Sequence, residues 1–331
     1  PHCRRQRQMC IRDRHRIVDF LFNAGTGWSG TTPFYFTLAQ DQKYVHTGYS
    51  KETCYLKLMT KSDEKRESYI RYKYITSLPG EPWIDAVDNR QFINPNETRQ
   101  HLQPPYSIKK YVDYYVRLAE RVKGTYHAVG DFSNSTFYLD EEFLLEVYTE
   151  LRKHFNVKVT FQFRDPIYRY FSRVGKYGHH FSMWTQQEKD ILKRAKKKKK
   201  FDHIGTYKRL LTEEPIHEGA LYVDGIKKFR RVFGKHNVLP VVMEEFFRGE
   251  QDISWFLEYP ITKIHENVFV PERGTKAPKL EGLVDQWSSE QDDISPELYE
   301  WSKQYLGFVY DEWKEYFGKL PDYWYSHADG I

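Results

Sequence analysis

The sequence predicts an α/β fold in which a central parallel sheet is flanked by helices. Short apolar runs of strand length alternate along the chain with stretches whose apolar residues recur at helical spacing. This alternation favours parallel strands joined by right-handed crossovers. The first apolar run leads directly into a glycine-rich loop, and ligands of such sheets bind at the carboxyl ends of the strands. The 331 residues are enough for one large α/β domain or two ordinary ones, and no convincing linker divides them.

The first strand is expected at residues 17–22, an apolar run of the kind that fills a buried strand. Gly25, Gly27 and Gly30 follow it directly and allow the backbone to turn sharply and approach an anion closely. Residues 25–32, GTGWSGTT, are called the phosphate loop below. Ser29, Thr31 and Thr32 add hydroxyl donors where the next helix would begin.

The phosphate loop fits two nucleotide-binding patterns. Its three glycines satisfy the dinucleotide fingerprint G-x-G-x-x-G, while Gly25 and Gly30 have the glycine spacing of a Walker A loop. The lysine of a Walker A loop would stand at position 31, where this chain has threonine. A triphosphate with magnesium would therefore lose its main fixed countercharge.

The remaining elements follow in order. Residues 28–39 form the expected first helix, in which Pro33 is tolerated near the start. In the helix expected at 108–122, Tyr111, Tyr114 and Leu118 recur at helical spacing. Further strands are expected at 43–46, 125–129, 157–163 and 238–242, and further helices at 141–154, from Pro166 onward, 188–194, 222–233, 254–257 and 295–317.

Two segments stand apart from this alternation. Residues 1–14 have neither apolar periodicity nor caps and are interpreted as a leader outside the fold; the alternative is a basic arm that contacts an acidic partner. Residues 60–103 are polar and rich in turn formers, and they predict a surface excursion with short helices. Residues 15–331 are therefore expected to form a single domain with an irregular insertion at 60–103.

Composition excludes several classes of protein. Lys and Arg number 51 against 46 Asp and Glu, so a mild preference for anionic ligands is expected but no nucleic-acid partner. The three cysteines have neither a disulfide framework nor metal-ligand spacing, and no metal is predicted. The sequence contains no stretch long enough to span a membrane and no signal-peptide core, so the cytoplasm is the default expectation.

A second anion-binding pattern, R-D-P-x-x-R-x-x-S, lies at residues 164–172. Arg164 leaves the end of a predicted strand, Pro166 begins a helix, and Ser172 lies two turns along it. The arginine fork and the hydroxyl can therefore converge on one phosphate. Alone, this pattern also fits an ordinary strand-to-helix junction. Together with the phosphate loop it predicts a ligand with two separate phosphate-type groups.

These two motifs resemble those of the sulfotransferases that use 3'-phosphoadenosine 5'-phosphosulfate (PAPS), with carbohydrate-type and bacterial members the most similar. In that family, G-x-x-[KR]-[SG]-G-T-T binds the 5'-phosphosulfate, and R-[DN]-P-x-x-R-x-x-S binds the 3'-phosphate. Residues 51–56, KETCYL, resemble the family's segment K-E-x-H-[FY]-[FL], which carries the catalytic base. Residues 130–135, GDFSNS, resemble the acceptor segment G-E-K-[ST]-P-[SA]. The resemblance spans about residues 17–279, with weaker matches at 238–247 and 273–276.

The resemblance implies a three-layer fold of the P-loop type, PAPS as the donor, no metal, and an acceptor hydroxyl on a carbohydrate. The implied catalytic residues are Glu52 as base, Lys51, and Asp131 as a second candidate base. The implied substrate-binding residues are Ser133 and Ser135. The implied donor-binding residues are Gly25, Thr26, Gly27, Trp28, Ser29, Gly30, Thr31, Thr32, Arg164, Ser172, Arg273, Gly274 and Lys276.

The chain departs from the family at three positions. Trp28 stands where the family has the loop lysine or arginine, Phe132 replaces the lysine of the acceptor segment, and Cys54 replaces a histidine near the base. Lys51 or Lys276 would have to compensate. Two alternatives therefore stay open: a P-loop kinase or NTPase, and a nucleotide- or glycan-binding module with little or no catalysis. A Rossmann dehydrogenase is disfavoured because no acidic residue ends the second strand near His46.

Overall fold

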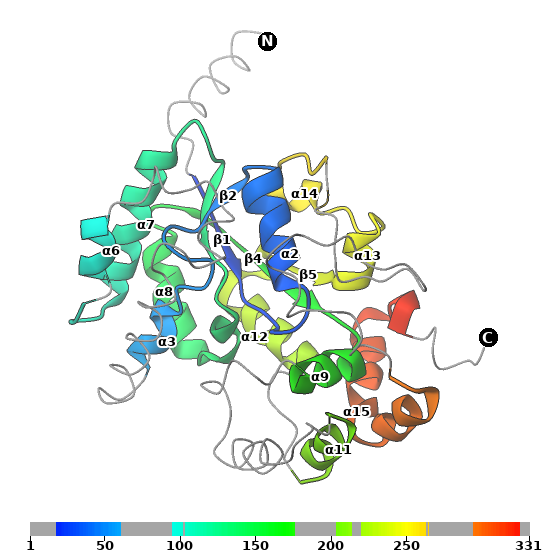
Figure 1. Cartoon of the computed structure of the whole chain (residues 1–331). Coiled ribbons are helices and arrows are strands. Elements are labelled where there is room, and N and C mark those ends of the chain that lie inside the picture. Colours follow the sequence, from blue (N-terminus) through cyan, green and yellow to red (C-terminus); the bar gives the residue numbers. More distant parts are fainter. Residues whose placement is uncertain are drawn as a thin grey trace, which may run out of the picture.

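The computed structural model describes residues 18–60, 95–101, 103–175, 203–213, 220–262, 264 and 294–324. Within them a five-stranded parallel sheet has the order β2-β3-β1-β4-β5, with β1 at its centre (Figure 1). The expected α/β fold with a parallel central sheet is confirmed. The strands are β1 (Asp19–Asn23), β2 (Val45–His46), β3 (Ala128–Asp131), β4 (Asn156–Phe163) and β5 (Val238–Val242).

Helices connect and cover these strands. In the first half of the chain they are α2 (Thr31–Phe36), α3 (Tyr55–Met59), α6 (Pro95–His101), α7 (Ile108–Val122), α8 (Glu141–Leu151) and α9 (Pro166–Gly175). In the second half they are α11 (His203–Glu213), α12 (Tyr222–Phe233), α13 (Met243–Phe247), α14 (Ser254–Leu257) and α15 (Pro296–Phe317).

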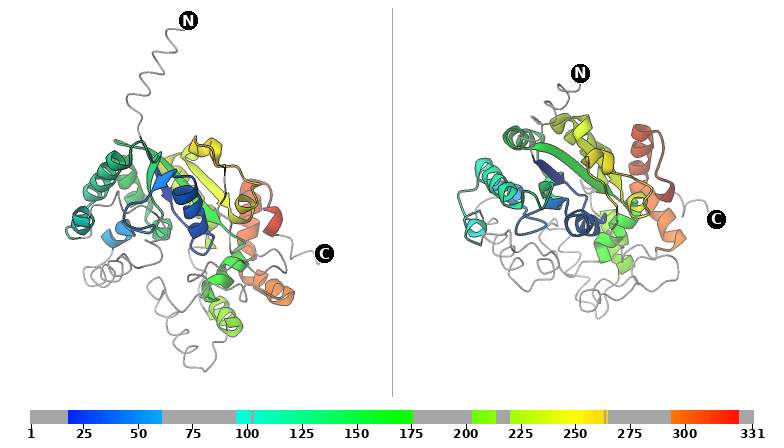
Figure 2. Two further views of the ribbon diagram at one scale, coloured as in Figure 1. Left: turned by 45° about the horizontal axis from the view of Figure 1, so that its top comes forward. Right: turned by 90° about the horizontal axis from the view of Figure 1, so that it is seen from above.

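The core consists of two clusters on opposite faces of the sheet, as the alternation of side chains along a strand requires. Phe20 and Phe22 of β1 pack in a large cluster with α7, α8, α12 and α15. Leu21, between them in sequence, faces a second cluster built with α2, α13 and α14. The described residues thus form three layers, helix on sheet on helix (Figures 1 and 2).

The expected elements agree with the structure where periodicity and caps coincide. The Ser107 side chain caps α7, with Oγ accepting from Lys110 N at 3.2 Å, and both ends of this helix lie where the sequence predicts them. The Ser295 side chain caps α15 in the same way, from Leu298 N at 3.2 Å, and Pro296 occupies the first turn.

Several elements have bounds that differ from expectation. Strand β2 begins at Val45 instead of residue 43, and α8 ends at Leu151 instead of residue 154. The strand expected at 125–129 begins only at Ala128, because Thr125 N and Tyr126 N both donate to Val122 O, at 2.9 and 3.0 Å, and extend the helix end as a turn. The helix expected at 28–39 begins at Thr31 and passes into a π-helical turn, Thr37–Asp41. Helices α3 and α11 were not expected from the pattern.

The end of the expected surface excursion is anchored in the core. His101, at the end of α6, is 2% exposed and stacks between Tyr55 and Tyr114, with ring centroids 4.2 and 4.3 Å away. Burial lowers the pKa of His101 from 6.5 to about 3, so the ring is neutral. This stack joins α6 to α7 and to α3, whose N-cap, Cys54, lies two residues after Glu52.

The chain order places the ends of β1 and β4 at a switch point. The connection that follows β1 runs through α2 on one face, while the connection that follows β4 runs through α9 and α12 on the other. In open α/β sheets the crevice at such a point binds ligands. The phosphate loop follows β1 and the Arg164 motif follows β4, so both lie at the neighbouring carboxyl ends of these two strands (Figure 1).

Some expectations fall on residues that the structure does not describe. They are the leader at 1–14, most of the insertion at 60–103, the helix at 188–194 and the segment at 273–276. In the part of the chain that is described, no helix is long and apolar enough to cross a membrane. The single-domain organisation stays a prediction.

Candidate functional site

The phosphate loop turns sharply between β1 and α2. Gly25 has φ +115° and Gly30 has φ +71°, values that side chains rarely permit. At Gly30 an added Cβ would also lie 2.7 Å from Met243 Sδ of α13. Glycine is therefore required at the point where the loop enters α2 and packs against the end of β5.

Hydrogen bonds to β4 hold the loop in place. Gln162 N donates to Gly25 O at 2.7 Å, and Thr26 N donates to Gln162 O at 2.9 Å. The hydroxyls of Thr26 and Ser29 are fully buried and hydrogen-bonded to each other at 2.7 Å. These two side chains therefore shape the loop from within, and their hydroxyls do not face a ligand.

The Arg164 motif has the geometry that its spacing predicts. Arg164 Nη1 donates to Ser172 Oγ at 2.7 Å, and the guanidinium is partly exposed. Asp165 caps α9, with Oδ1 accepting from Ile167 N at 2.9 Å and Tyr168 N at 3.1 Å. The arginine and the serine thus form one unit that can engage an anion with several donors.

Asp165 also ties this turn to the C-terminal helix. Tyr299 and Tyr310 of α15 donate their hydroxyls to Asp165 at 2.8 and 3.0 Å, and Asp165 N donates to Glu244 Oε1 at 3.1 Å. Burial raises the pKa of Asp165 from 3.8 to about 7, and it raises the pKa of Glu244 as well. A buried aspartate and a partly buried glutamate therefore support the turn that presents Arg164.

Arg169 connects the two motifs. It extends from α9, is 2% exposed, and donates from Nε to Gly27 O at 2.9 Å. The sequence pattern contains Arg169, but no role could be assigned to it from spacing alone. A neighbouring arginine, Arg173, was not anticipated: its guanidinium lies 5.7 Å from the centre of the Trp28 ring.

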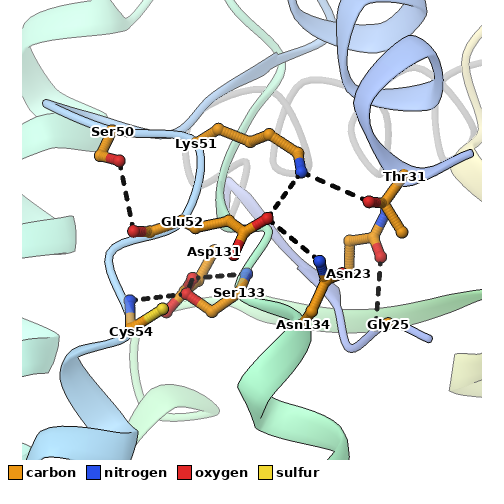
Figure 3. Close-up of polar contacts among 10 residues, drawn as sticks. All are labelled: Asn23, Gly25, Thr31, Ser50, Lys51, Glu52, Cys54, Asp131, Ser133 and Asn134. Atoms are coloured by element: carbon orange, nitrogen blue, oxygen red, sulfur yellow. Dashed lines mark hydrogen bonds and ion pairs between the residues drawn. The ribbon is translucent and has the colours of Figure 1, made fainter. Parts of the chain in front are cut away.

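Lys51 and Glu52 lie beside the start of α2. Lys51 Nζ donates to Thr31 Oγ1 at 3.3 Å and to Glu52 Oε1 at 2.9 Å (Figure 3). Asn134 Nδ2 donates to the same carboxylate oxygen at 3.0 Å. The side chains of Lys51 and Glu52 are 11% and 24% exposed, so the pair is sheltered but accessible. Asn134 is a site residue that the sequence reasoning missed, because the family segment has proline at this place.

Asp131 occupies a supporting position instead of a reactive one. It has no exposed surface, and its oxygens accept from Thr53 Oγ1 at 3.0 Å, Tyr111 OH at 2.9 Å, Ser133 N at 3.0 Å and Ser133 Oγ. Burial raises its pKa. We therefore remove Asp131 from the candidate bases: a carboxylate with both oxygens engaged inside the core does not reach an acceptor hydroxyl.

Ser133 belongs to the same buried group. Its Oγ donates to Asp131 and accepts from Cys54 N at 2.7 Å, and the side chain is 1% exposed (Figure 3). Ser133 therefore fastens residues 51–54 to the end of β3 and is withdrawn as a substrate-binding residue. Ser135 is buried too, at 6% exposure. Among residues 130–135 it is Asn134 whose side chain reaches Glu52.

The remaining candidate residues fall into two groups. Arg273, Gly274 and Lys276 lie outside the described residues. Trp28 and Thr32 are partly exposed on the phosphate loop. Within the described ranges, no group of three His, Cys, Asp or Glu side chains could hold a metal ion.

Comparisons with known proteins yield solved structures only. No family model and no curated protein matches the chain. It is similar to a sulfotransferase from Alicyclobacillus acidocaldarius, with 16% identity, a TM-score of 0.48, and coverage of 92% of this chain and 97% of that one. It is also similar to the sulfotransferase domain of the olefin synthase from Synechococcus PCC 7002, with 13% identity, a TM-score of 0.45 and coverage of 92% and 95%.

A third similar structure is sulfotransferase STF9 from Mycobacterium avium, with 14% identity, a TM-score of 0.42, and coverage of 94% of this chain and 81% of that one. All three are sulfotransferases by description. At these identities, and with TM-scores below 0.5, the likeness assigns neither a donor nor an acceptor to this chain.

Proposed function

We propose that the chain transfers a sulfuryl group from PAPS to an acceptor hydroxyl. One observation carries the proposal: two anion-binding motifs, 142 residues apart at Gly27 and Arg169, lie at adjacent strand ends and are joined by a 2.9 Å hydrogen bond. Each motif offers donors suited to a phosphate. Two such positions side by side fit a nucleotide that carries separate phosphate groups on one ribose better than they fit a linear triphosphate.

The binding roles follow from the geometry. Backbone N–H groups of the phosphate loop would hold the phosphosulfate end of the donor, and Arg164 with Ser172 would hold the 3'-phosphate. Lys51, already hydrogen-bonded to Thr31 at 3.3 Å, is a cation at the edge of the loop. This position supports the proposal that Lys51 compensates for the lysine or arginine that the loop lacks.

The reaction class requires a base and a stabilised leaving group. The donor supplies an activated sulfuryl group, and its transfer resembles phosphoryl transfer in being limited by positioning and electrostatics. Glu52 would accept the proton of the acceptor hydroxyl. In the structure Glu52 is paired with Lys51 at 2.9 Å, so a shift of Lys51 toward the donor would release the carboxylate for that task.

A carbohydrate is the acceptor class that we favour. The support is the resemblance of residues 51–56 to carbohydrate-type members, together with a composition that includes 8 Trp, 26 Tyr and 51 Lys and Arg. Aromatic faces stack on sugar rings, and basic groups meet sugar carboxylates and sulfates. Aryl and alkyl acceptors belong in the same assay as competing classes.

A nucleotide-binding module without transfer is the second candidate. The specific observation that favours it is the phosphate loop itself, which contains no lysine or arginine. A kinase or NTPase would need a countercharge for a triphosphate at position 31, and Thr31 is 5% exposed with its hydroxyl engaged by Lys51.

Isothermal titration calorimetry distinguishes the ligand classes. We expect micromolar binding of adenosine 3',5'-bisphosphate, and much weaker binding of ATP with magnesium and of NAD. Arg164→Ala should abolish bisphosphate binding. Arg152→Ala is the matched control. Arg152 is exposed at the end of α8, shortly before the amino end of β4, whereas Arg164 follows the carboxyl end of β4, so this variant should bind as the wild type does. A preference for ATP or NAD would overturn the proposal.

A further inference from the structure

The phosphate loop has no cation of its own. Residues 25–32 contain glycine, threonine, serine and tryptophan only. Backbone N–H groups can orient an anion, but a doubly charged phosphate group in a sheltered loop also needs a nearby positive charge. That charge must come from another element.

Helix α9 presents two buried arginines to the loop. Arg169 and Arg173 are one helical turn apart and therefore share a face. Both are 2% exposed. Arg169 is fixed to the loop through Gly27 O at 2.9 Å, and within the described residues its Nη2 is buried without a hydrogen-bond partner.

Arg173 lies beside Trp28, the loop residue that follows Gly27. Its guanidinium is 5.7 Å from the ring centre of Trp28 and 5.4 Å from that of Tyr170, distances at which a cation is attracted to an aromatic face. Trp28 has φ +65°, in the left-handed region that bulky side chains avoid. The strained residue in the loop is thus the one that contacts Arg173, and such strain persists where the surroundings fix it.

Buried guanidinium groups are costly unless an anion accompanies them. No described carboxylate forms an ion pair with Arg169, whose Nη2 is left for a further acceptor. Arg169 instead adjoins the backbone of the phosphate loop through Gly27 O. An anion bound at the loop is suited to the acceptor position that Arg169 Nη2 leaves open, and Arg173 lies beside the same loop at Trp28.

We propose that Arg173, held against the indole of Trp28, supplies a second countercharge, in addition to Lys51, for the phosphate group bound at the phosphate loop. Arg169 fixes α9 to Gly27 and so sets the distance between that charge and the loop. The inference rests on the proposed nucleotide-binding function and deepens it. It assigns Arg173 to the 5'-phosphate and leaves Arg164 with Ser172 for the 3'-phosphate.

Two monophosphates separate these assignments. Calorimetry would compare adenosine 5'-monophosphate, adenosine 3'-monophosphate and the 3',5'-bisphosphate on the same proteins. Arg173→Gln should weaken binding of the 5'-monophosphate and the bisphosphate by about tenfold or more, and leave the 3'-monophosphate unchanged. Arg164→Ala should weaken binding of the 3'-monophosphate and the bisphosphate and leave the 5'-monophosphate unchanged. Arg173→Lys should retain most of the wild-type affinity for all three nucleotides.

Relocating the charge tests whether Arg173 acts electrostatically. Trp28→Lys in the Arg173→Gln background should restore most of the 5'-phosphate affinity and its dependence on salt, which a purely structural role of Arg173 would not allow. If Arg173→Gln fails to fold, Trp28→Leu keeps Arg173 but removes its aromatic support, and we expect the same selective loss for the 5'-monophosphate.

The outcomes are distinguishable. Suppose that the wild type binds the bisphosphate and Arg164→Ala does not. If Arg173→Gln or Trp28→Leu then binds the 5'-monophosphate as tightly as the wild type, only the assignment of Arg173 is overturned. An equal loss for both monophosphates also overturns it. Wild-type protein that does not bind the bisphosphate overturns the proposed function and this inference together.

Discussion

Arg169 Nε donates a hydrogen bond to Gly27 O at 2.9 Å, and the Arg169 side chain is buried, at 2% exposure. This single contact joins the loop that follows β1 to the helix that follows β4. It fixes the spacing between the two positions at which we propose that the donor's phosphate groups bind.

Replacing Arg169 should therefore affect both stability and binding. Arg169→Met should lower the free energy of unfolding by about 2 kcal/mol, because a buried charge-assisted hydrogen bond is lost and Gly27 O is left without its donor. Bisphosphate affinity should fall as well. Arg231→Met is the control: Arg231 pairs with Glu141 at 2.6 Å on the surface, is 59% exposed, and should change stability by less than about 0.5 kcal/mol. Chemical denaturation of the three proteins measures the stability changes, and calorimetry measures the bisphosphate affinity. Equal stability of Arg169→Met and the wild type would contradict the structural role of Arg169.

A side chain at Gly30 is expected to be destabilising. Gly30→Ala combines an unfavourable φ of +71° with a Cβ that would lie 2.7 Å from Met243 Sδ, and we expect a loss of about 2–4 kcal/mol. Gly249→Ala shares the positive φ, +75°, but meets no atom within 4 Å, so it should cost only about 1 kcal/mol. Thermal unfolding compares the two variants, and similar losses would show that packing at Gly30 is not limiting.

Asp165 should make stability depend on pH. Burial raises its pKa from 3.8 to about 7, so between these values the folded protein holds a proton that the unfolded chain releases. Stability from this group is therefore greatest at low pH and falls as pH rises toward about 7, by up to about 1.4 kcal/mol per pH unit. Glu244, whose pKa is also raised by desolvation, acts in the same direction.

Asp165→Asn tests this dependence, since the amide remains neutral and keeps an oxygen that can accept from Ile167 N and Tyr168 N. Free energies of unfolding measured from pH 5 to 8 should decline less steeply for this variant than for the wild type. Parallel curves would mean that Asp165 is ionised throughout, as it would be if the buried turn admitted water.

Lys51 should matter for binding more than for folding. Its Nζ connects Thr31 and Glu52 at 3.3 and 2.9 Å, beside the loop and partly open to solvent. Lys51→Met should weaken bisphosphate binding by about tenfold, with little change in unfolding temperature. Lys109→Met is the control, because Lys109 pairs with Asp113 on an exposed surface, at 81% exposure. Unchanged affinity in Lys51→Met would exclude Lys51 as a countercharge.

The regular elements could be predicted where a local pattern decides them. Helix α7 has the bounds that periodicity indicates, because a buried stripe and the Ser107 cap agree, and α12 and β5 also have their expected bounds. Helix α3 could not be predicted in this way. It has five residues, follows Cys54 in a left-handed conformation at φ +50°, and depends on packing that the sequence does not display.

The candidate site shows the same division. The pairing of Arg164 with Ser172 follows from helix spacing, and it is present at 2.7 Å. The contact of Arg173 with Trp28 joins residues 145 positions apart and arises only when β1 and β4 pair. Asp131 was misread for a related reason: whether a carboxylate faces a cleft or the core depends on Tyr111 and Thr53, which tertiary structure brings to it.

Glu52 offers the most direct test of sulfuryl transfer. With radiolabelled PAPS and a panel of polysaccharide, aryl and alkyl acceptors, the wild type should label a carbohydrate. Glu52→Gln should reduce turnover by about 10²–10⁴-fold while binding adenosine 3',5'-bisphosphate as tightly as the wild type. A wild type that binds the bisphosphate but labels no acceptor, or a Glu52→Gln variant that transfers at the wild-type rate, would contradict the account.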